Sequence, residues 1–200
     1  ADAARLISPA LGSQDNAIRI EAIRLSGLWA LNEHSTTITS IATNQPENLP
    51  MRLAATKALG SMSDPAIIKI LEKLTTLETP PIIRAGAIES LATLDVTRAA
   101  SLTALLLTKA EAKEIEPLLS ALLQRSRGAD ELAATLPVKT IPVDTAKLMR
   151  RWLNSNGRNE PKLTEVLNKI IGLKGTTQAY NPDYVTVLAQ EALNEGNAVN

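Results

Sequence analysis

The chain has 200 residues, and its 21 lysines and arginines balance 21 aspartates and glutamates, so the formal net charge is zero. This balance argues against broad electrostatic capture of nucleic acid or of an anionic membrane, because both need a basic surface. Cysteine is absent, which excludes disulfides, thiolate metal sites and a cysteine nucleophile. No apolar run approaches the roughly 18 residues that cross a bilayer. The start shows no secretory signal, and its alanine in place of methionine indicates a piece of a longer protein.

The first expected element is a helix over residues 3–12, followed by a turn that ends at Asp15. Asp15 is a candidate N-cap for the next helix, because an aspartate side chain accepts hydrogen bonds from the free N–H groups at a helix start. That helix opens a first unit, residues 16–47, whose second helix around 36–43 is short and polar.

The second unit, residues 49–79, shows the helical pattern most clearly. Apolar residues recur at helical spacing over 51–62, and the alanines between them allow close approach of a neighbouring helix. Gly60, near the end of this helix, predicts either a left-handed cap or a close contact. Asp64 and the following Pro65 are expected to begin the second helix of the unit.

Arg52 in this unit has counterparts at nearly equal spacing on either side, Arg19 before it and Arg84 after it. An alanine follows each arginine at the third position, and a large apolar residue follows at the tenth, namely Ala22, Ala55 and Ala87, then Trp29, Met62 and Leu94. The third unit is 81–110. Self-similarity at a period of roughly 20–50 residues is typical of a solenoid or a propeller. Helical periodicity selects the solenoid, so the sequence predicts an all-α fold, an α–α superhelix. The pattern apolar-Arg-x-x-Ala resembles a HEAT repeat, of the HEAT/armadillo kind.

The pattern degrades after residue 110, where Glu116 occupies the position of the next arginine. Pro117 is expected near the first turn of a helix, Gly128 breaks that helix, and Asp144 is expected to cap another after an extended stretch over 137–143. We therefore expect one solenoid domain over residues 1–200, regular in its first half and irregular in its second. The degenerate helical pairs are 115–136, 144–171 and 181–196.

Three groups of residues are candidates for a chemical role. His34 is the only histidine, and one histidine without cysteine does not make a zinc site, so a surface or capping role is expected. Glu111, Glu114 and Glu116 are expected on a solvated helix end beside lysines rather than in a catalytic cleft. The three repeated arginines read as structural bonds to carboxylates or helix-end carbonyls, or alternatively as a row of anion-binding groups. We predict no catalytic, cofactor-binding or metal-binding residue, and the partner-binding residues stay unknown.

The segment 147–174 is locally basic, with seven basic residues, which are Lys147, Arg150, Arg151, Arg158, Lys162, Lys169 and Lys174. It is expected to be a solvated face, with docking of an acidic partner domain or an anionic ligand as the alternative. Trp152 follows two of these arginines. It reads as a core residue at helical spacing from Leu148, or alternatively as an exposed aromatic anchor. Gly172 and Gly175 predict a helix C-cap and a turn rather than a phosphate-binding loop.

The second half resembles one bacterial family over 115–136, over 141–152 and at the closing segment Ala192-Leu193-Asn194-Glu195-Gly196-Asn197-Ala198. The family is the haem-binding, membrane-bound dehydrogenase proteins of planctomycetes, verrucomicrobia and related bacteria, which join a β-propeller, a HEAT-repeat region and a cytochrome c domain. The resemblance implies that this chain is the middle region of such a protein, exported to the periplasm or cell envelope. It departs from the family in having no CxxCH haem motif and no propeller sequence.

We therefore expect a non-catalytic scaffold or spacer that mediates protein–protein or interdomain contacts, with no cofactor, no nucleic acid and no membrane insertion. A cytochrome c or dehydrogenase domain is the partner that the resemblance implies. The alternatives are a stand-alone protein-binding adaptor, a nucleic-acid-binding HEAT-like protein and an enzyme in its own right. A basic groove with exposed aromatics would favour nucleic acid, whereas the four Trp and Tyr residues and the zero net charge argue against it.

Overall fold

The computed structural model describes residues 2–173. These residues form only helices and connecting turns, with no strand among them. The helices are α1 (Asp2–Leu11), α2 (Asn16–Leu28), the 3-10 turn η1 (Asn32–His34), α3 (Ser35–Thr43), α4 (Leu49–Leu59), α5 (Ala66–Lys73), α6 (Pro81–Leu94), α7 (Val96–Leu107), α8 (Ala112–Leu123), α9 (Gly128–Thr135), α10 (Val143–Ser155) and α11 (Pro161–Ile171). The helix expected at 181–196, Gly175, Lys174 and the segment 192–198 lie outside the described residues.

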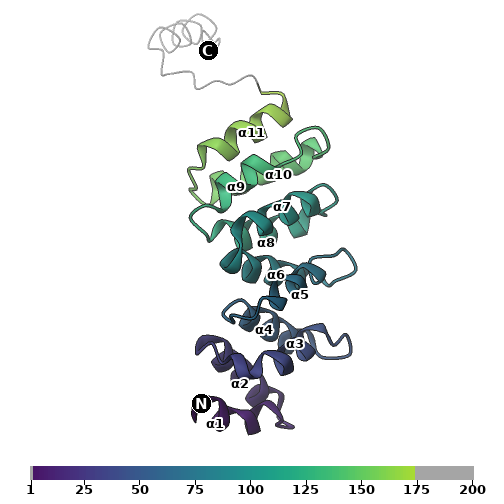
Figure 1. The fold of residues 1–200 in the computed structure, drawn as a ribbon. Coiled ribbons are helices and arrows are strands. Elements are labelled where there is room, and N and C mark those ends of the chain that lie inside the picture. The colour runs from purple at the N-terminus through teal and green to yellow at the C-terminus, as the bar shows by residue number, and fades with distance from the viewer. Residues whose placement is uncertain (1, 174–200) are drawn as a thin grey trace, which may run out of the picture.

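The helices stack in two layers, with α1 and α11 at opposite ends of the stack (Figure 1). In the first layer, α2, α4, α6, α8 and α10 each pack against the next. In the second layer, α9 packs on both α7 and α11, whereas α5 packs on α6. Each helix therefore contacts near neighbours in the chain, which is the packing of an α-solenoid. The predicted fold class is confirmed.

The first-layer helices keep a nearly constant spacing after residue 110, where the arginine pattern ends. The first-layer helices begin at residues 16, 49, 81, 112 and 143. Contacts across one repeat length continue in the second half, where Arg125 donates to the Thr93 hydroxyl at 2.7 Å and Lys162 lies 2.7 Å from Asp130. The chain thus keeps one repeat length throughout the described residues. A solenoid can be divided before or after each arginine-bearing helix, so the repeat boundaries stay a prediction.

Polar side chains cap the starts of several helices. Asp15 accepts from the Ala17 N–H at 2.8 Å, which confirms its predicted role, and Asp64 accepts from the Ala66 N–H at 2.8 Å. Asn48 and Asp95 cap α4 and α7 in the same manner, at 2.9 Å each. These side chains satisfy N–H groups that have no partner within the helix. At the other end, Gly172 follows α11 in the left-handed conformation, with φ of 79°, as its expected role as a C-cap requires.

Small residues bring the first-layer helices into backbone contact. A Cβ on Gly27 would lie 2.7 Å from the Ala58 Cα, and a Cβ on Gly60 would lie 2.9 Å from the Ser90 Cα. Gly60 has an ordinary φ of −64°, so of the two roles predicted for it the close contact is correct and the left-handed cap is wrong. The core around these contacts is aliphatic, with Ile, Leu, Ala and Met as its buried apolar residues.

Three local predictions in the second half are wrong. Pro117 is the sixth residue of α8, not part of its first turn, because Glu114 accepts from the Glu111 N–H at 3.0 Å and the helix begins earlier. The stretch 137–143 is not extended throughout, since the Thr140 and Ile141 N–H groups both donate to the Pro137 carbonyl. Asp144 is inside α10 and does not cap it, because the helix already begins at the residue after Pro142.

Candidate interaction surface

The three repeated arginines hold each first-layer helix to the end of the helix before it. Arg19 Nε donates to the Leu11 carbonyl and Arg52 Nε to the Ala42 carbonyl, each at 3.3 Å. Arg84 Nη2 donates to the Thr79 carbonyl at 3.1 Å. The acceptors lie at or beyond C-terminal helix ends, where carbonyls lack intrahelical partners. Arg52 and Arg84 are buried, so the structural interpretation is confirmed and a row of anion-binding groups is excluded.

Two of these arginines also pair with a carboxylate, Arg19 at the end of its own unit and Arg84 in the following helix of the first layer. Arg19 pairs with Glu47 at 3.2 Å, and Arg84 Nη1 lies 3.4 Å from Glu114. Glu114 is therefore buried, and its expected place on a solvated helix end is wrong. The partner that buries it comes from α6, the preceding helix of the first layer.

The two neighbouring carboxylates have different surroundings. Glu111 is exposed and pairs with Lys113 at 2.8 Å. The hydrogen bond and the charge of Lys113 lower the pKa of the Glu111 carboxyl below its ordinary value. Glu116 is exposed as well. The three glutamates do not converge on one cleft, so they do not form a site for acid–base catalysis.

His34 is buried, which contradicts its expected surface or capping role. Its Nδ1 lies 2.8 Å from the Ser26 hydroxyl, and its Nε2 lies 3.1 Å from the Ala4 carbonyl and 3.1 Å from the Ser8 hydroxyl. The prediction failed because α1, which is distant in the sequence, contacts the ring through the Ala4 carbonyl and the Ser8 hydroxyl. Within the described residues no group of three or more histidine and carboxylate side chains is placed to hold a metal ion.

Three of the six basic residues over 147–173 have carboxylate partners within the chain. Lys147 pairs with Asp144, Lys162 with Asp130, and Arg158 with Glu160, at 3.1, 2.7 and 2.8 Å. Arg158 also donates to the Leu123 carbonyl at 2.7 Å, and Arg150 contacts the Asn168 side chain. Trp152 packs against the hydrophobic core, as the core interpretation predicted.

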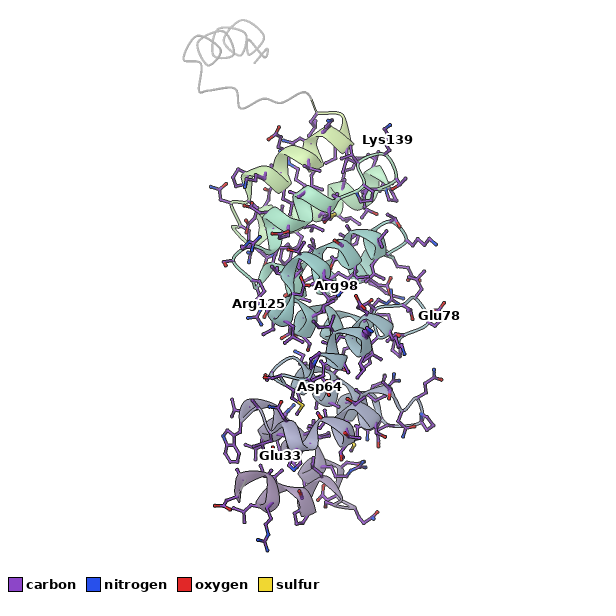
Figure 2. All side chains as sticks on the ribbon, in the orientation of Figure 1. Glu33, Asp64, Glu78, Arg98, Arg125 and Lys139 are labelled. Carbon is purple, nitrogen blue, oxygen red and sulfur yellow. The ribbon has the colours of Figure 1, made fainter. Side chains whose placement is uncertain are left out.

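Charged side chains elsewhere do not gather in one cleft either. Figure 2 shows the labelled residues, among them Glu33, Asp64 and Lys139, spread along the length of the stack. Many of the ion pairs link helices or join residues three or four positions apart. None of the described helices is both long and apolar enough to cross a bilayer. Charged side chains therefore do not mark a binding site in the described part of the chain. Hollows and exposed apolar side chains indicate the candidate surface instead.

Two adjoining hollows lie on the first layer, one of about 420 Å³ between α2 and α4 and one of about 240 Å³ among α4, α6 and α8. The two hollows share Leu53 and Lys57. We call this surface the groove face, and its principal side chains are Arg24, Leu28, Leu53, Lys57, Ile82 and Pro117.

Large apolar side chains are exposed on the groove face. Leu28 is 76% exposed and Ile82 is 52% exposed. These exposed side chains could not be predicted from the sequence, because two adjacent isoleucines such as Ile82 and Ile83 do not show which of them faces the core. In the structure Ile83 is buried and Ile82 is exposed. A separate hollow of about 340 Å³ lies between α5 and α7 in the second layer, where Leu105 is 63% exposed. That hollow lies between two helices only, α5 and α7, whereas the groove face extends across four helices.

Residues 3–92 match the family model of HEAT repeats. This part of the chain, which holds α1 to most of α6, is therefore a HEAT-repeat region, and it contains all three repeated arginines. The remaining helices extend the same stack at the same spacing. No curated protein and no solved structure matches the chain significantly.

Proposed function

We propose that this chain is a non-catalytic helical-repeat scaffold that binds another protein, or a neighbouring domain, through the groove face. The observation that supports it is the pair of adjoining hollows across α2, α4, α6 and α8, at which Leu28 and Ile82 are exposed. Contiguous exposed apolar surface on a protein usually marks an interaction site. The hollow between α2 and α4, at about 420 Å³, also lies within the roughly 300–1,000 Å³ that ligand pockets usually have.

The way the helices pack would make the groove face a stiff platform. Gly27 against Ala58 and Gly60 against Ser90 hold successive helices at backbone contact. The Ser90 hydroxyl of α6 also donates to the Thr56 carbonyl of α4 at 2.9 Å. A preorganised surface loses little conformational freedom when it binds, so more of the contact energy appears as affinity. The scaffold would thus act by geometry, fixing the position of whatever it binds.

Two substitutions on the groove face test the proposal. Leu28→Glu and Ile82→Glu each place a charge in the groove, and both side chains are already exposed, so the fold should survive. We expect each variant to reduce capture of the binding protein from an extract of the source cells by at least about tenfold. Leu105→Glu, an equally exposed leucine in the second layer, is the control and should capture as the wild type does. Equal capture by all variants would refute the proposal.

We further propose that the scaffold lies within an exported, haem-containing, dehydrogenase-like protein. The support is the sequence resemblance of 115–136, 141–152 and 192–198. The partner would then be the cytochrome c or dehydrogenase domain of that protein, in the periplasm or cell envelope. Since these 200 residues contain no cysteine, covalent haem attachment would need a CxxCH motif in another part of it.

Sequencing the gene on both sides of this segment tests the parent protein. A CxxCH motif soon after Asn200 and a propeller before Ala1 would agree with it. A stop codon near Asn200 without a propeller would contradict it, and the chain would then be a stand-alone adaptor. The role of the groove face is the same in both settings.

A further inference from the structure

Each first-layer helix presents the same positions to the helix before it. Ala58 of α4 packs against Gly27 of α2, and Ser90 of α6 packs against Gly60 at the end of α4. Ala58 and Ser90 are both the sixth residue after the repeated arginine of their helix, and the residue seven positions earlier lies on the same side of the helix. We call this side the leading face, and its residues are Ile18 and Leu25 in α2, Met51 and Ala58 in α4, and Ile83 and Ser90 in α6.

The leading face of α2 is exposed, whereas those of α4 and α6 are buried. Ile18 is 50% exposed, although its counterparts Met51 and Ile83 are completely buried. The difference follows from the packing, because α4 and α6 each lie between two first-layer helices, whereas α2 packs on α4 alone in the described part of the first layer. The leading face of α2 therefore belongs to one end of the stack, the end at which α1 lies (Figure 1).

α1 does not take the place of the missing neighbour. Arg19 donates to the Leu11 carbonyl of α1 as Arg52 donates to the Ala42 carbonyl of α3, so α1 lies beside α2 as α3 lies beside α4. α1 is therefore a second-layer helix. The second-layer helices α3, α5, α7 and α9 each follow a first-layer helix in the chain. The unit to which α1 belongs has no such first-layer member among residues 2–173.

Large side chains at this end of α2 do not prevent another helix from covering it. Leu25 is nine residues after the start of α2, and Trp152 has the same position in α10. α10 nevertheless packs on α8. Trp29, four residues after Leu25, is 52% exposed, compared with 1% for Met62 and 36% for Leu94 at its position in the next two units. The leading face of α2 thus resembles a face that this chain already covers with a helix.

The opposite end of the first layer does not complement this face. Leu53 and Gly60 of α4 both contact α6. Lys147 and Asn154 have the corresponding positions in α10, and both are polar and exposed. A second copy stacked head to tail would place these polar groups on the apolar leading face of α2. A polar outer face is typical of a terminal unit in a solenoid, so the α10 end has the character of a cap and the α2 end does not.

We propose that a helix leading into α1 covers the leading face of α2, as the first-layer member of α1's own unit. It lies parallel to α2, because successive first-layer helices are related by the same repeat. It presents apolar side chains to Ile18, Leu25 and Trp29, which are removed from water on packing. This contact shares no residue with the groove face, so the inference goes beyond the proposed function and does not depend on it.

The chain extended by the residues that precede Ala1 in its gene, for about one repeat length or roughly 35 residues, tests the inference. Trp152→Phe in every chain leaves Trp29 as the only tryptophan, and acrylamide quenching of its fluorescence reports whether the face is covered. We expect the extension to lower the quenching constant at least about twofold, because Trp29 is removed from water. An unchanged constant, or a start codon directly before Ala1, would overturn the inference.

A second extended chain shows whether the face accepts a helix at all. It carries a copy of residues 111–127, which are α8 with its turn into α9, directly before Ala1. α8 is chosen because it already packs on α10, whose leading face is equally bulky. If this copy lowers the quenching constant and the natural extension does not, the protein does not supply the helix and the inference falls. It falls as well if neither extension lowers the constant.

Two exposed isoleucines locate the contact. Ile18→Glu should return the quenching constant of the naturally extended chain to that of the chain without extension, because an unpaired charge is costly to bury. Ile82→Glu, at an isoleucine of the groove face with nearly the same exposure, is the matched control and should leave the constant unchanged. Far-UV circular dichroism confirms that each variant stays folded. Equal effects of the two substitutions would overturn the inference, whereas partner capture by Ile82→Glu tests the proposed function separately.

Pairing of two copies of this chain through their α2 ends gives a different result. Sedimentation would then show a concentration-dependent dimer of the chain without extension, and Ile18→Glu would abolish it. Such a dimer, together with an unchanged quenching constant in the naturally extended chain, would overturn the inference in favour of a second copy.

Discussion

Arg84 in α6 and Glu114 in α8 form an ion pair, with 3.4 Å between Nη1 and Oε1, and both side chains are buried. The pair joins two successive first-layer helices in the middle of the stack. Glu114→Ala leaves the Arg84 guanidinium buried without its counter-charge, so we expect a loss of about 3 kcal/mol in the free energy of unfolding. Urea denaturation measures it. Glu116→Ala, an exposed glutamate of the same helix, should change the free energy by less than about 0.5 kcal/mol. Equal effects of the two substitutions would contradict the assignment.

The contact of Gly27 with Ala58 predicts that adding a single methyl group at Gly27 destabilises the fold. Gly27→Ala would place a Cβ 2.7 Å from the Ala58 Cα, and a backbone atom moves only if the helices separate. Overpacking costs about 1–3 kcal/mol, which outweighs the gain of up to about 1 kcal/mol from alanine in a helix. We expect a net loss of about 1 kcal/mol in the free energy of unfolding. Gly12→Ala, where a Cβ meets only an ordinary contact at 3.6 Å, should not destabilise the chain.

His34 links α1 to α2, because its ring contacts groups of both helices. His34→Ala removes the contacts of the ring with the Ser26 hydroxyl and the Ala4 carbonyl and leaves a cavity, so we expect a loss of about 2 kcal/mol. The loss should be local. Amide hydrogen exchange should show reduced protection in α1 and unchanged protection in α6 and α7. Glu33→Ala at the exposed neighbouring residue is the control. A uniform loss of protection along the chain would contradict this role.

The pair of Glu111 with Lys113 predicts a small pH dependence at the start of α8. The hydrogen bond and the charge of Lys113 lower the pKa of Glu111 in the folded chain. Its contribution to stability is therefore present above the pKa of the unfolded chain and is lost as the pH falls through the lower, folded pKa. Lys113→Ala should raise the Glu111 pKa toward its ordinary value. A titration of the carboxyl carbons by NMR measures both, and an unchanged Glu111 midpoint in the variant would show that Lys113 does not act on it.

Local signals in the sequence predicted much of the fold. The repeated arginines with their alanines predicted the solenoid, and Asp15 marked a helix start that the structure has. The errors fall where a residue depends on a distant partner. Nothing near His34 in the sequence indicates that α1 covers it, and the arginine that buries Glu114 belongs to the preceding helix of the first layer. The groove face was missed for the same reason, because the exposure of Ile82 depends on how three helices stack.

The binding role of the groove face is the central claim, and a footprint of the bound partner tests it most directly. Amide hydrogen exchange of the chain alone would be compared with exchange in the complex with the captured protein. We expect added protection in α2, α4, α6 and α8, strongest around Leu28, Leu53 and Ile82. Protection confined to α3, α5 and α7, or no protection in the first layer, would show that the chain binds through another surface.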